Sequence, residues 1–538
     1  MPSPIVVSIS RVGLFLVAIG AWACSRAAQG PSAELSPQFR APSRLRVVAT
    51  GEVAGTIEPC GCVEDQLGGL DRFATAVQKA SRDEPTLVLE AGALFFPKAK
   101  VDAAEQGELL WRAEILAKTL RSLKAFAWAP GSSDTAFGTQ VCADLSKRAA
   151  MRALPAPGPN APIASSGFAT PRYAVTVLNG VRIGIFGSTS KSIDGSTDDI
   201  STKMRAAAKE LDAQGARLKI ALLSMPPSKA VQAVEKVPAF QLVVIGGSED
   251  VGMGADSDGA EPQMIATTLV VQPPNHLRGF VSVDFTVRDG IFTFQDATGV
   301  GRNLELRELS LRIAELTERV QVWKRQNQAA TLLAAREADL KRLSARYAEL
   351  SKPVGIPTAS YFTVQTTSIG KDIASDPEVR RTLDDLGRRI NQTNRDKFAH
   401  RKAPPAAPDQ PAYVGVSSCE TCHAKPAKFW RTTRHARAYQ TLVDKDRQFT
   451  LECVGCHVTG YEQPGGSSVT DVATLQNVQC ENCHGPGSIH AKTSAKNAIT
   501  RVPNRQLCAT RCHHSPNVAP NWSVDDAWPR ILGPGHGQ

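Results

Sequence analysis

Cys419-Glu-Thr-Cys422-His423 opens a series of similar stretches near the end of the chain, followed by Cys453-Val-Gly-Cys456-His457 and Cys480-Glu-Asn-Cys483-His484. Each is a C-x-x-C-H motif, in which two cysteine thiols take up the vinyl groups of a haem and the adjacent histidine ligates its iron. The spacing suits this chemistry because thiols three residues apart reach one edge of the porphyrin and the next imidazole lies under the iron. A fourth copy, Cys508-Ala-Thr-Arg-Cys512-His513, has one extra residue between its cysteines. The sequence therefore predicts three haem c groups and a fourth at a looser site.

Two alternatives use the same residue types, because zinc sites and disulfide scaffolds also contain C-x-x-C pairs. The four motifs account for eight of the twelve cysteines, and a histidine follows the second cysteine directly in each of them. A zinc or disulfide framework does not require that regular histidine, so haem c is the favoured interpretation.

The sequence around these motifs, over residues 413–538, resembles the tetrahaem cytochrome c five-fifty-four family. The similar stretches are Tyr413-Val-Gly, Trp430, His435-Ala-Arg-Ala, Cys456-His-Val-Thr-Gly-Tyr461, Pro464-Gly-Gly and Val478-Gln-Cys-Glu-Asn-Cys-His-Gly-Pro-Gly-Ser-Ile-His490. The resemblance implies that His435 and His490 are distal ligands, each of a haem attached elsewhere, and it implies a mainly helical and irregular domain.

The supply of axial ligands limits the kinds of haem that this region can hold. Besides the four motif histidines it contains His435, His490, His514 and His536, and it contains no methionine. His/Met ligation is therefore excluded within the region, and bis-histidine or five-coordinate haems of low potential are expected. A helix predicted over 425–441 would put His435 about 18 Å along from His423 at about 1.5 Å per residue, so His435 should ligate a different haem.

Composition describes an ordinary folded protein of 538 residues, with 42% hydrophobic and 21% charged residues. A formal net charge of +10 would suggest an anionic partner, but four haems would add about eight propionates to the balance. No basic and aromatic surface for nucleic acid is evident, so we expect no nucleic-acid partner. The expected partner is a redox protein or a small-molecule electron donor or acceptor.

The N-terminus has the features of an export signal in residues 1–23. Arg11 precedes an apolar run over 12–23 that is too short to span a bilayer, and small residues Ala21 and Ala23 stand before Cys24. The arrangement resembles a lipoprotein signal, which implies a lipid anchor at Cys24; cleavage after an Ala-x-Ala sequence is the alternative. Either way we expect an extracytoplasmic protein, either periplasmic or anchored to a membrane.

After a linker over 24–43, a first domain is predicted over 44–301. Short apolar runs typical of strands alternate there with helical patterns, which indicates a layered α/β domain. The strands are expected at 45–50, 86–90, 181–186, 219–223, 242–245 and 279–287, and helices at 70–80, 109–120 and 202–214.

The landmarks of this domain resemble the metallophosphoesterase domain of the periplasmic 5′-nucleotidase and UDP-sugar hydrolase family. They are Thr50-Gly-Glu-Val-Ala-Gly55, Gly68-Gly-Leu-Asp-Arg72, Glu90-Ala-Gly-Ala93, Gly131-Ser-Ser-Asp134 and Gly246-Gly-Ser-Glu-Asp250. The family has Asp, His and Asn ligands for two metal ions at these points. This chain has Glu52, Ala54, Ala93, Ser132, Ser133, Met225, Ser248 and Asp250 there, and no histidine before His276. We therefore expect the fold without phosphohydrolase activity, because the two-metal site lacks its ligands.

Glu58-Pro-Cys60-Gly-Cys62 follows the first predicted strand, where the lost site would lie. The Cys60 and Cys62 pair is compatible with a redox disulfide, a metal site or a thiol pair acting on a sulfur or redox substrate. A structural disulfide without turnover, with Cys142 left over, is equally compatible with the pattern.

Residues 302–352 show the 4-3-4-3 apolar spacing of a long helix, with a phase slip near 326–330. An extended coiled-coil helix over 304–350 that separates domains or forms a homodimer is favoured over a helical hairpin. The connecting segment 353–402 is expected to contain a strand near 361–365 and a helix over 377–391. A proline-rich linker at 403–412 leads into the haem domain.

Two functions remain open from the sequence. The first is electron transfer through closely spaced bis-histidine haems, with the first domain serving for docking or substrate binding. The second is a multihaem oxidoreductase acting on a small inorganic nitrogen or sulfur compound, at an open-coordinate haem or at Cys60 and Cys62. The number of distal histidines discriminates between them.

Overall fold

The computed structural model describes residues 41–59, 66–154, 173–189, 199–247, 257–326, 329–352, 355–514, 518, 522–534 and 536. The chain divides into residues 1–41 and one compact unit, residues 42–538. The predictions for Cys24, Cys60, Cys62, Ser248 and Asp250 lie outside the described residues, as does the export signal. Among the helices within the described ranges, none is long and apolar enough to cross a membrane.

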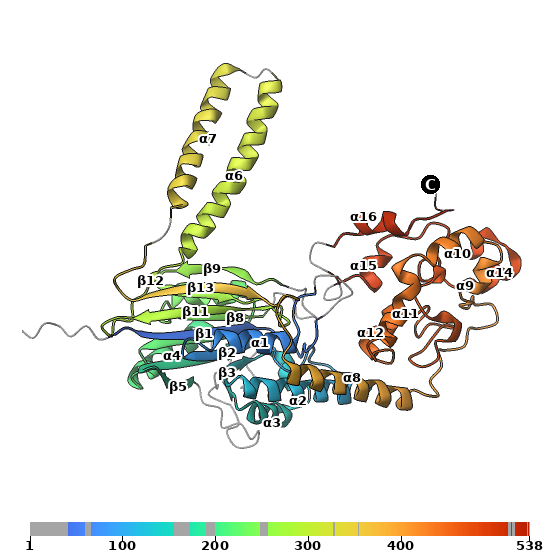
Figure 1. Ribbon diagram of the computed structural model, residues 1–538, viewed down its shortest axis with the longest axis horizontal. Coiled ribbons are helices and arrows are strands. Elements are labelled where there is room, and N and C mark those ends of the chain that lie inside the picture. The colour runs from blue at the N-terminus through green and yellow to red at the C-terminus, as the bar shows by residue number, and fades with distance from the viewer. Residues whose placement is uncertain are drawn as a thin grey trace, which may run out of the picture. The chain divides into compact units, whose positions relative to one another are not determined.

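The first part of the compact unit contains two mixed β-sheets (Figure 1). The seven-stranded sheet has the order β12-β13-β11-β1-β2-β3-β4 and the six-stranded sheet the order β5-β6-β7-β8-β10-β9. The strands are β1 (Ser43–Gly51), β2 (Thr86–Gly92), β3 (Ala125–Pro130), β4 (Arg152–Ala153), β5 (Tyr173–Leu178), β6 (Val181–Thr189), β7 (Leu218–Ser224), β8 (Leu242–Gly246), β9 (Ala260–Ile265), β10 (Thr268–Gln272), β11 (Gly279–Val287), β12 (Gln295–Asp296) and β13 (Tyr361–Ser368).

The two sheets pack face to face, with helices on their outer faces. Val47 of β1 and Ile220 of β7 belong to one buried cluster between the sheets, whereas Val48 points to the opposite face, as alternation along a strand requires. The outer face of the first sheet is covered by α1 (Leu70–Ala80), α2 (Gln106–Ser122), α3 (Thr139–Ala149) and α8 (Pro377–Lys397). The other sheet carries α4 (Ile200–Ala213) and α5 (Pro227–Lys236). These four layers confirm the predicted layered α/β domain.

The seven-stranded sheet continues beyond residue 301, where the sequence places the end of the domain. β13 pairs antiparallel with β11 over eight residue pairs, from Tyr361 opposite Thr286 to Ser368 opposite Gly279. The segment 353–402 therefore belongs to the sheet and its covering helices, because β13 and α8 both pack on the first domain.

The single extended helix predicted over 304–350 is wrong. Two helices, α6 (Val300–Arg325) and α7 (Ala330–Leu350), lie antiparallel as a hairpin (Figure 1). Lys324 pairs with Glu337 near the turn, and Arg346 pairs with Glu305 near the base. The apolar phase slip near 326–330 marks the reversal, because a continuous seam would have had to change faces there.

The C-terminal part consists of short helices and irregular chain. The helices are α9 (Val416–Glu420), α10 (Ala424–Trp430), η2 (Arg434–Arg437), α11 (Ala438–Val443), α12 (Leu451–His457), η3 (Ala473–Leu475), α13 (Cys480–His484), α14 (Ser488–Thr493), η4 (Lys496–Ala498), α15 (Leu507–Arg511), α16 (Val524–Ala527) and η5 (Trp528–Ile531). The continuous helix predicted over 425–441 is therefore wrong, since it breaks between α10 and η2. Thr432 and Thr433 close the break with turns onto Phe429 and Trp430.

Apolar packing in this C-terminal part is sparse. Its buried cluster consists of Tyr439, Val454, Val458 and Val472. So small a cluster is typical of domains that depend on a cofactor, a metal or disulfides for stability.

Candidate haem-binding site

Each cysteine motif lies on or beside a short helical turn. In the first motif, the His423 amide donates to the Cys419 carbonyl over 2.8 Å, which is the helical i to i+4 pattern. In the fourth motif, the His513 amide donates to the Cys508 carbonyl over 2.7 Å, across five residues. This wider turn absorbs the extra residue, so His513 still follows its first cysteine by one turn of the backbone.

Cys422 differs from the other motif cysteines. The sequence predicts that Cys419 and Cys422 both lie against the first haem, yet the Cys422 side chain is exposed, whereas the other seven motif cysteines are partly buried. The Cys419 thiol lies 3.7 Å from the Gly415 carbonyl, so the chain covers only one thiol of this pair. Both cysteines lie on one turn of the backbone, because the Cys422 amide donates to the Cys419 carbonyl over 3.3 Å.

Three pairs of histidine rings face one another at nearly equal separations. The ring centres of His423 and His490 lie 6.2 Å apart. Those of His435 and His513 lie 6.1 Å apart, and those of His484 and His536 also lie 6.1 Å apart. Each pair joins a motif histidine to one of the predicted distal candidates, and the structure brings His435 to His513 rather than to His423.

The separations match bis-histidine ligation of an iron. Imidazole nitrogens bind metal ions at about 2.0–2.1 Å, as in zinc sites, so two imidazoles that held one metal ion between them would keep their ring centres well apart. The three pairs therefore fit an iron between their rings.

Backbone carbonyls hold several of these imidazoles through the nitrogen that would not bind iron. The Nδ1 atom of His484 donates to the Thr500 carbonyl over 2.7 Å, and that of His490 donates to the Ala495 carbonyl over 3.0 Å. His536 and His457 make the same kind of bond, to the Gly533 and Ala438 carbonyls. A proton on Nδ1 leaves the lone pair on Nε2, which is the tautomer that a haem iron requires.

The second motif is carried by α12, with His457 at its C-terminal end. Burial lowers the pKa of His457, which favours the neutral imidazole. His435 and His513 also have pKa values lowered mainly by burial. Apart from the three pairs, His514 is the remaining distal candidate of the sequence, and it lies close enough to Cys456 and His513 to lower their pKa values.

Cysteines of different motifs influence one another's pKa values, which indicates which motifs are neighbours. The Cys480 thiol of the third motif raises the pKa of Cys419 in the first, and Cys419 lowers the pKa of Cys480. In the same way Cys456 of the second motif raises the pKa of Cys512 in the fourth, and Cys512 lowers the pKa of Cys456. Cys483 of the third motif lies within electrostatic range of Cys508 in the fourth. The motifs thus follow one another in the order first, third, fourth, second.

Comparison with known proteins agrees with this region. Residues 418–485 match the model of the family described as cytochrome c554 and c-prime. Cytochrome c-554 of Nitrosomonas europaea is 36% identical over 97 residues, covering 15% of this chain and 41% of that protein. The C-terminal region resembles cytochrome c554. The matched segment contains the first three motifs, which supports a multihaem c-type cytochrome with covalent haem c, whereas the chain spans about two fifths of the length of that curated relative.

The α/β part gives only distant structural likenesses. A 5′-nucleotidase precursor from Thermus thermophilus has a TM-score of 0.42 at 15% identity, covering 68% of this chain and 61% of that one. The calcineurin-like phosphoesterase YfkN from Bacillus subtilis has a TM-score of 0.41 at 13% identity, with 67% and 100% covered. The sulfate thiohydrolase SoxB from Thermus thermophilus has a TM-score of 0.42 at 9% identity, with 80% and 73% covered.

Glu481, the second residue of the third motif, is a site residue that the sequence did not single out. Its carboxylate is 1% exposed and accepts hydrogen bonds from the amides of Val414, Gly415 and Gly487, at 2.7 to 3.2 Å. Glu481 thereby binds two other segments to the third motif: the residues just before the first motif, Val414 and Gly415, and the turn at Gly487 before His490. The sequence could not indicate this role, because Glu481 occupies a position of the C-x-x-C-H motif at which any residue is allowed.

A second long-range clamp holds His435. The Trp430 indole donates to the Val478 carbonyl over 2.8 Å, and the Val478 amide donates to the His435 carbonyl over 3.1 Å. Because Val478 lies two residues before Cys480, these bonds tie the distal histidine to the start of the third motif.

The positions at which the resemblance places metal ligands, among them Glu52, Ala93 and Ser132, follow the carboxyl ends of β1, β2 and β3. Asp134 is fully buried and accepts hydrogen bonds from the amides of Leu94, Phe95 and Gly131. It supports the loops instead of facing a ligand, and burial raises its pKa to about 7. The Ser133 hydroxyl donates to the Phe96 carbonyl over 2.6 Å. Within the described ranges, no cluster of three or more His, Cys, Asp or Glu side chains is arranged to hold a metal ion.

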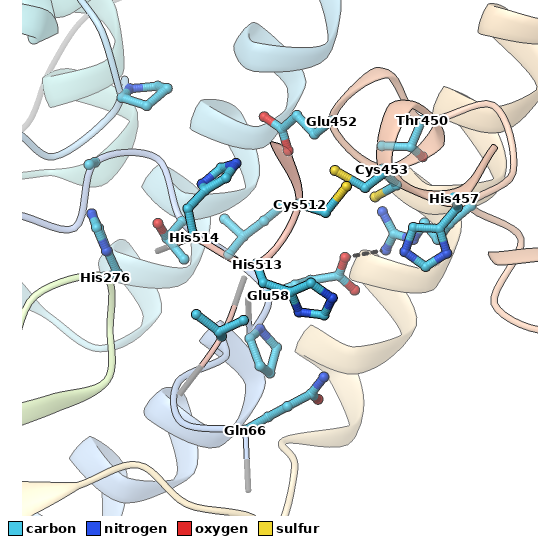
Figure 2. Close-up of a pocket in the computed structure, with 18 of the residues that line it drawn as sticks. Glu58, Gln66, His276, Thr450, Glu452, Cys453, His457, Cys512, His513 and His514 are labelled. Carbon is cyan, nitrogen blue, oxygen red and sulfur yellow. Dashed lines mark ion pairs between the residues drawn. The ribbon is translucent and has the colours of Figure 1, made fainter. Parts of the chain in front are cut away.

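One cavity of about 2510 Å³ reaches both the carboxyl edge of the sheets and the cysteine motifs. Figure 2 shows His276 on one side of it and Cys453 and His457 on the other, with Glu58, Cys512 and His513 between them. Pockets for one small molecule measure roughly 300–1,000 Å³, so this volume fits more than one cofactor-sized group. Cys142, in contrast, is buried in α3, and burial raises its pKa, as expected of an inert structural thiol.

Proposed function

We propose that this chain is an exported multihaem c-type cytochrome that transfers electrons through low-potential bis-histidine haems. The observation that carries the proposal is the set of three histidine pairs with ring centres 6.1 to 6.2 Å apart, each including a motif histidine. Two imidazoles on one iron favour low potential and leave no position for a substrate, which suits electron transfer.

The order of the motifs supports a linear path for the electrons. Haems attached at the first and third motifs would share an edge where Cys419 meets Cys480, and those at the second and fourth would share one where Cys456 meets Cys512. The haem at Cys453 and Cys456 would end this path. A redox protein or a small-molecule donor or acceptor would exchange electrons at one end.

The proposal also assigns a cellular location to the protein and a role to its α/β domain. Covalent haem c is attached outside the cytoplasm, in keeping with the export signal expected over residues 1–23, and Cys24 would carry a lipid anchor. The α/β domain would serve for docking or substrate binding without hydrolysis.

The experiment is a count of covalent haem. Mature protein, purified from a host with a cytochrome c maturation system, should keep its red colour after denaturation. Intact-mass measurement should show four added haems, one each at the pairs Cys419 and Cys422, Cys453 and Cys456, Cys480 and Cys483, and Cys508 and Cys512. Protein that carries zinc and no added haem would contradict the proposal.

The alternative, a multihaem oxidoreductase, has one specific support. The cavity lined by the second motif also reaches the carboxyl edge of the sheets, where a small substrate would have room. The ferric spin state discriminates between the two functions: an all-low-spin protein supports electron transfer alone, and a native high-spin haem supports a substrate site.

A further inference from the structure

The segment that leads into the second motif is held by helix α8 of the α/β domain. The Phe449 amide donates to Oδ1 of Asn391 over 2.9 Å, and the Phe449 carbonyl accepts from Nδ2 of Asn394 over 2.9 Å. Asn394 is only 5% exposed. Both backbone polar groups of one residue are therefore satisfied by side chains of α8, which fixes the register of the segment on the helix.

Arg447, two residues before Phe449, makes a closer contact with the same helix. Its guanidinium group lies against Gly387 in the middle of α8, where an added Cβ would come within 3.0 to 3.1 Å of it. Glycine is unfavourable in a helix interior, and here its missing side chain makes room for Arg447. The same guanidinium pairs with Glu58 over 2.5 Å.

Arg112 on α2 forms the second charged contact. It pairs with Glu108 on its own helix over 2.5 Å and with Glu452 over 2.8 Å, and Glu452 is the residue directly before Cys453. The side chains of Arg112 and Glu108 are 15% and 8% exposed, so both charges depend on their partners.

The charges of Arg112, Arg447 and Glu452 also act on the sulfur of Cys453, the atom that would attach the haem. Burial, aided by Glu452, raises the pKa of the Cys453 thiol to about 12, and Arg112 and Arg447 oppose that rise. A charge that reaches Cys453 would reach a macrocycle bonded to it, and Arg112, 15% exposed, would be screened by water less than Glu452, 49% exposed.

We propose that α2, α8 and Glu58 form a cradle that holds the second haem-bearing segment on the α/β domain and sets the reduction potential of its haem, with Arg112 as a positioning residue. This rests on the proposed function, because it requires a haem at Cys453 and Cys456. The physical reason is that the ferrous haem carries one positive charge less than the ferric haem. Loss of Arg112 therefore favours the ferric state, and loss of the Glu452 charge favours the ferrous state.

The test is a spectroelectrochemical titration of the full holo-protein in three variants. Arg112→Met should shift the midpoint potential of one haem downward, Glu452→Gln should shift that same potential upward, and the double variant should return it toward wild type. The other haems should stay unmoved. A purely structural role would not give opposite shifts that cancel. Glu452→Gln leaves Arg112 paired with Glu108, so it decides the question even if Arg112→Met does not fold.

The matched control is Arg148→Met, which removes an exposed arginine that faces Glu114 at 3.8 Å, with side chains 62% and 46% exposed. It should leave every potential unchanged. Holo-protein in which neither Arg112→Met nor Glu452→Gln shifts a potential would overturn the cradle and leave the proposed function standing. Wild-type protein without covalent haem would overturn the proposed function itself.

Discussion

At the scale of single residues, His435 and His490 are the side chains whose roles can be separated most cleanly. His435 faces His513 and His490 faces His423, at ring separations suited to one iron each. We expect His435→Ala and His490→Ala each to convert one low-spin ferric haem to high spin, because each change removes one of two axial ligands. Electron paramagnetic resonance and cyanide binding measure this conversion.

The control for both variants is His400→Ala, since His400 is exposed and follows α8 outside the cysteine motifs. The His400→Ala variant should have the same haem spin states as the wild-type protein. The distal assignment is wrong if His435→Ala and His490→Ala both keep the wild-type spectrum and the wild-type resistance to protease.

Glu90 on β2 should make the stability of the α/β domain depend on pH. Its side chain is 1% exposed and accepts a hydrogen bond from the Thr50 hydroxyl. Burial, followed by the nearby Asp134, raises the pKa of Glu90 well above 4.5. The folded state keeps its proton at pH values where the unfolded chain has released it, so the free energy of unfolding falls as pH rises above 4.5.

Glu90→Gln should make that fall shallower, because glutamine keeps the shape and does not titrate. Asp134, whose pKa is raised to about 7, contributes with the same sign, so part of the slope remains. The measurement is the thermal midpoint by far-ultraviolet circular dichroism between about pH 4.5 and 8, with the exposed Glu235→Gln as control. Parallel curves for Glu90→Gln and wild type would refute this role.

At the scale of elements, the loops after β1, β2 and β3 decide whether the α/β domain can hydrolyse a phosphoester. Glu52, Ala54 and Ala93 stand where metal ligands are expected from the resemblance, and Asp134 is used by backbone amides. We expect no turnover of nucleotides or other phosphoesters with manganese, cobalt or zinc, because two cations must be held as a fixed pair. Turnover above the metal-only blank that disappears in Glu52→Ala would contradict this.

The α6–α7 hairpin shows how one short irregularity changes an element. Both helices keep the apolar spacing, yet few of their side chains are buried. Among the described side chains, Val300 and Val320 are the buried ones in α6, and α7 has none. Ion pairs at both ends, Lys324 with Glu337 and Arg346 with Glu305, accompany the fold-back. Exposed pairs of this kind contribute little energy, so they accompany the fold-back and do not drive it.

At the scale of the whole molecule, the C-terminal part relies on bonds between distant segments more than on apolar burial. Its small cluster around Val454 contrasts with the large clusters between and outside the two sheets. Cross-ligation of the kind proposed for His423 and His490 would join segments that few apolar contacts hold. Loss of haem should therefore unfold this part and leave the α/β layers folded, which limited proteolysis of haem-free and haem-loaded protein would measure.

The sequence alone determined the features that depend on neighbouring residues. The cysteines and first histidine of each haem motif lie within five or six positions, and the strands and helices of the α/β domain follow from periodicity, as β11 and α1 do at their predicted bounds. Only the tertiary structure decided which histidines face each other, that Cys422 is left open, that Glu481 ties three backbone segments together, and that Arg112 and Gly387 receive the second motif. The physical reason is that local pattern reports backbone conformation and burial, whereas these contacts join residues tens to hundreds of positions apart, whose meeting depends on how the layers and turns pack.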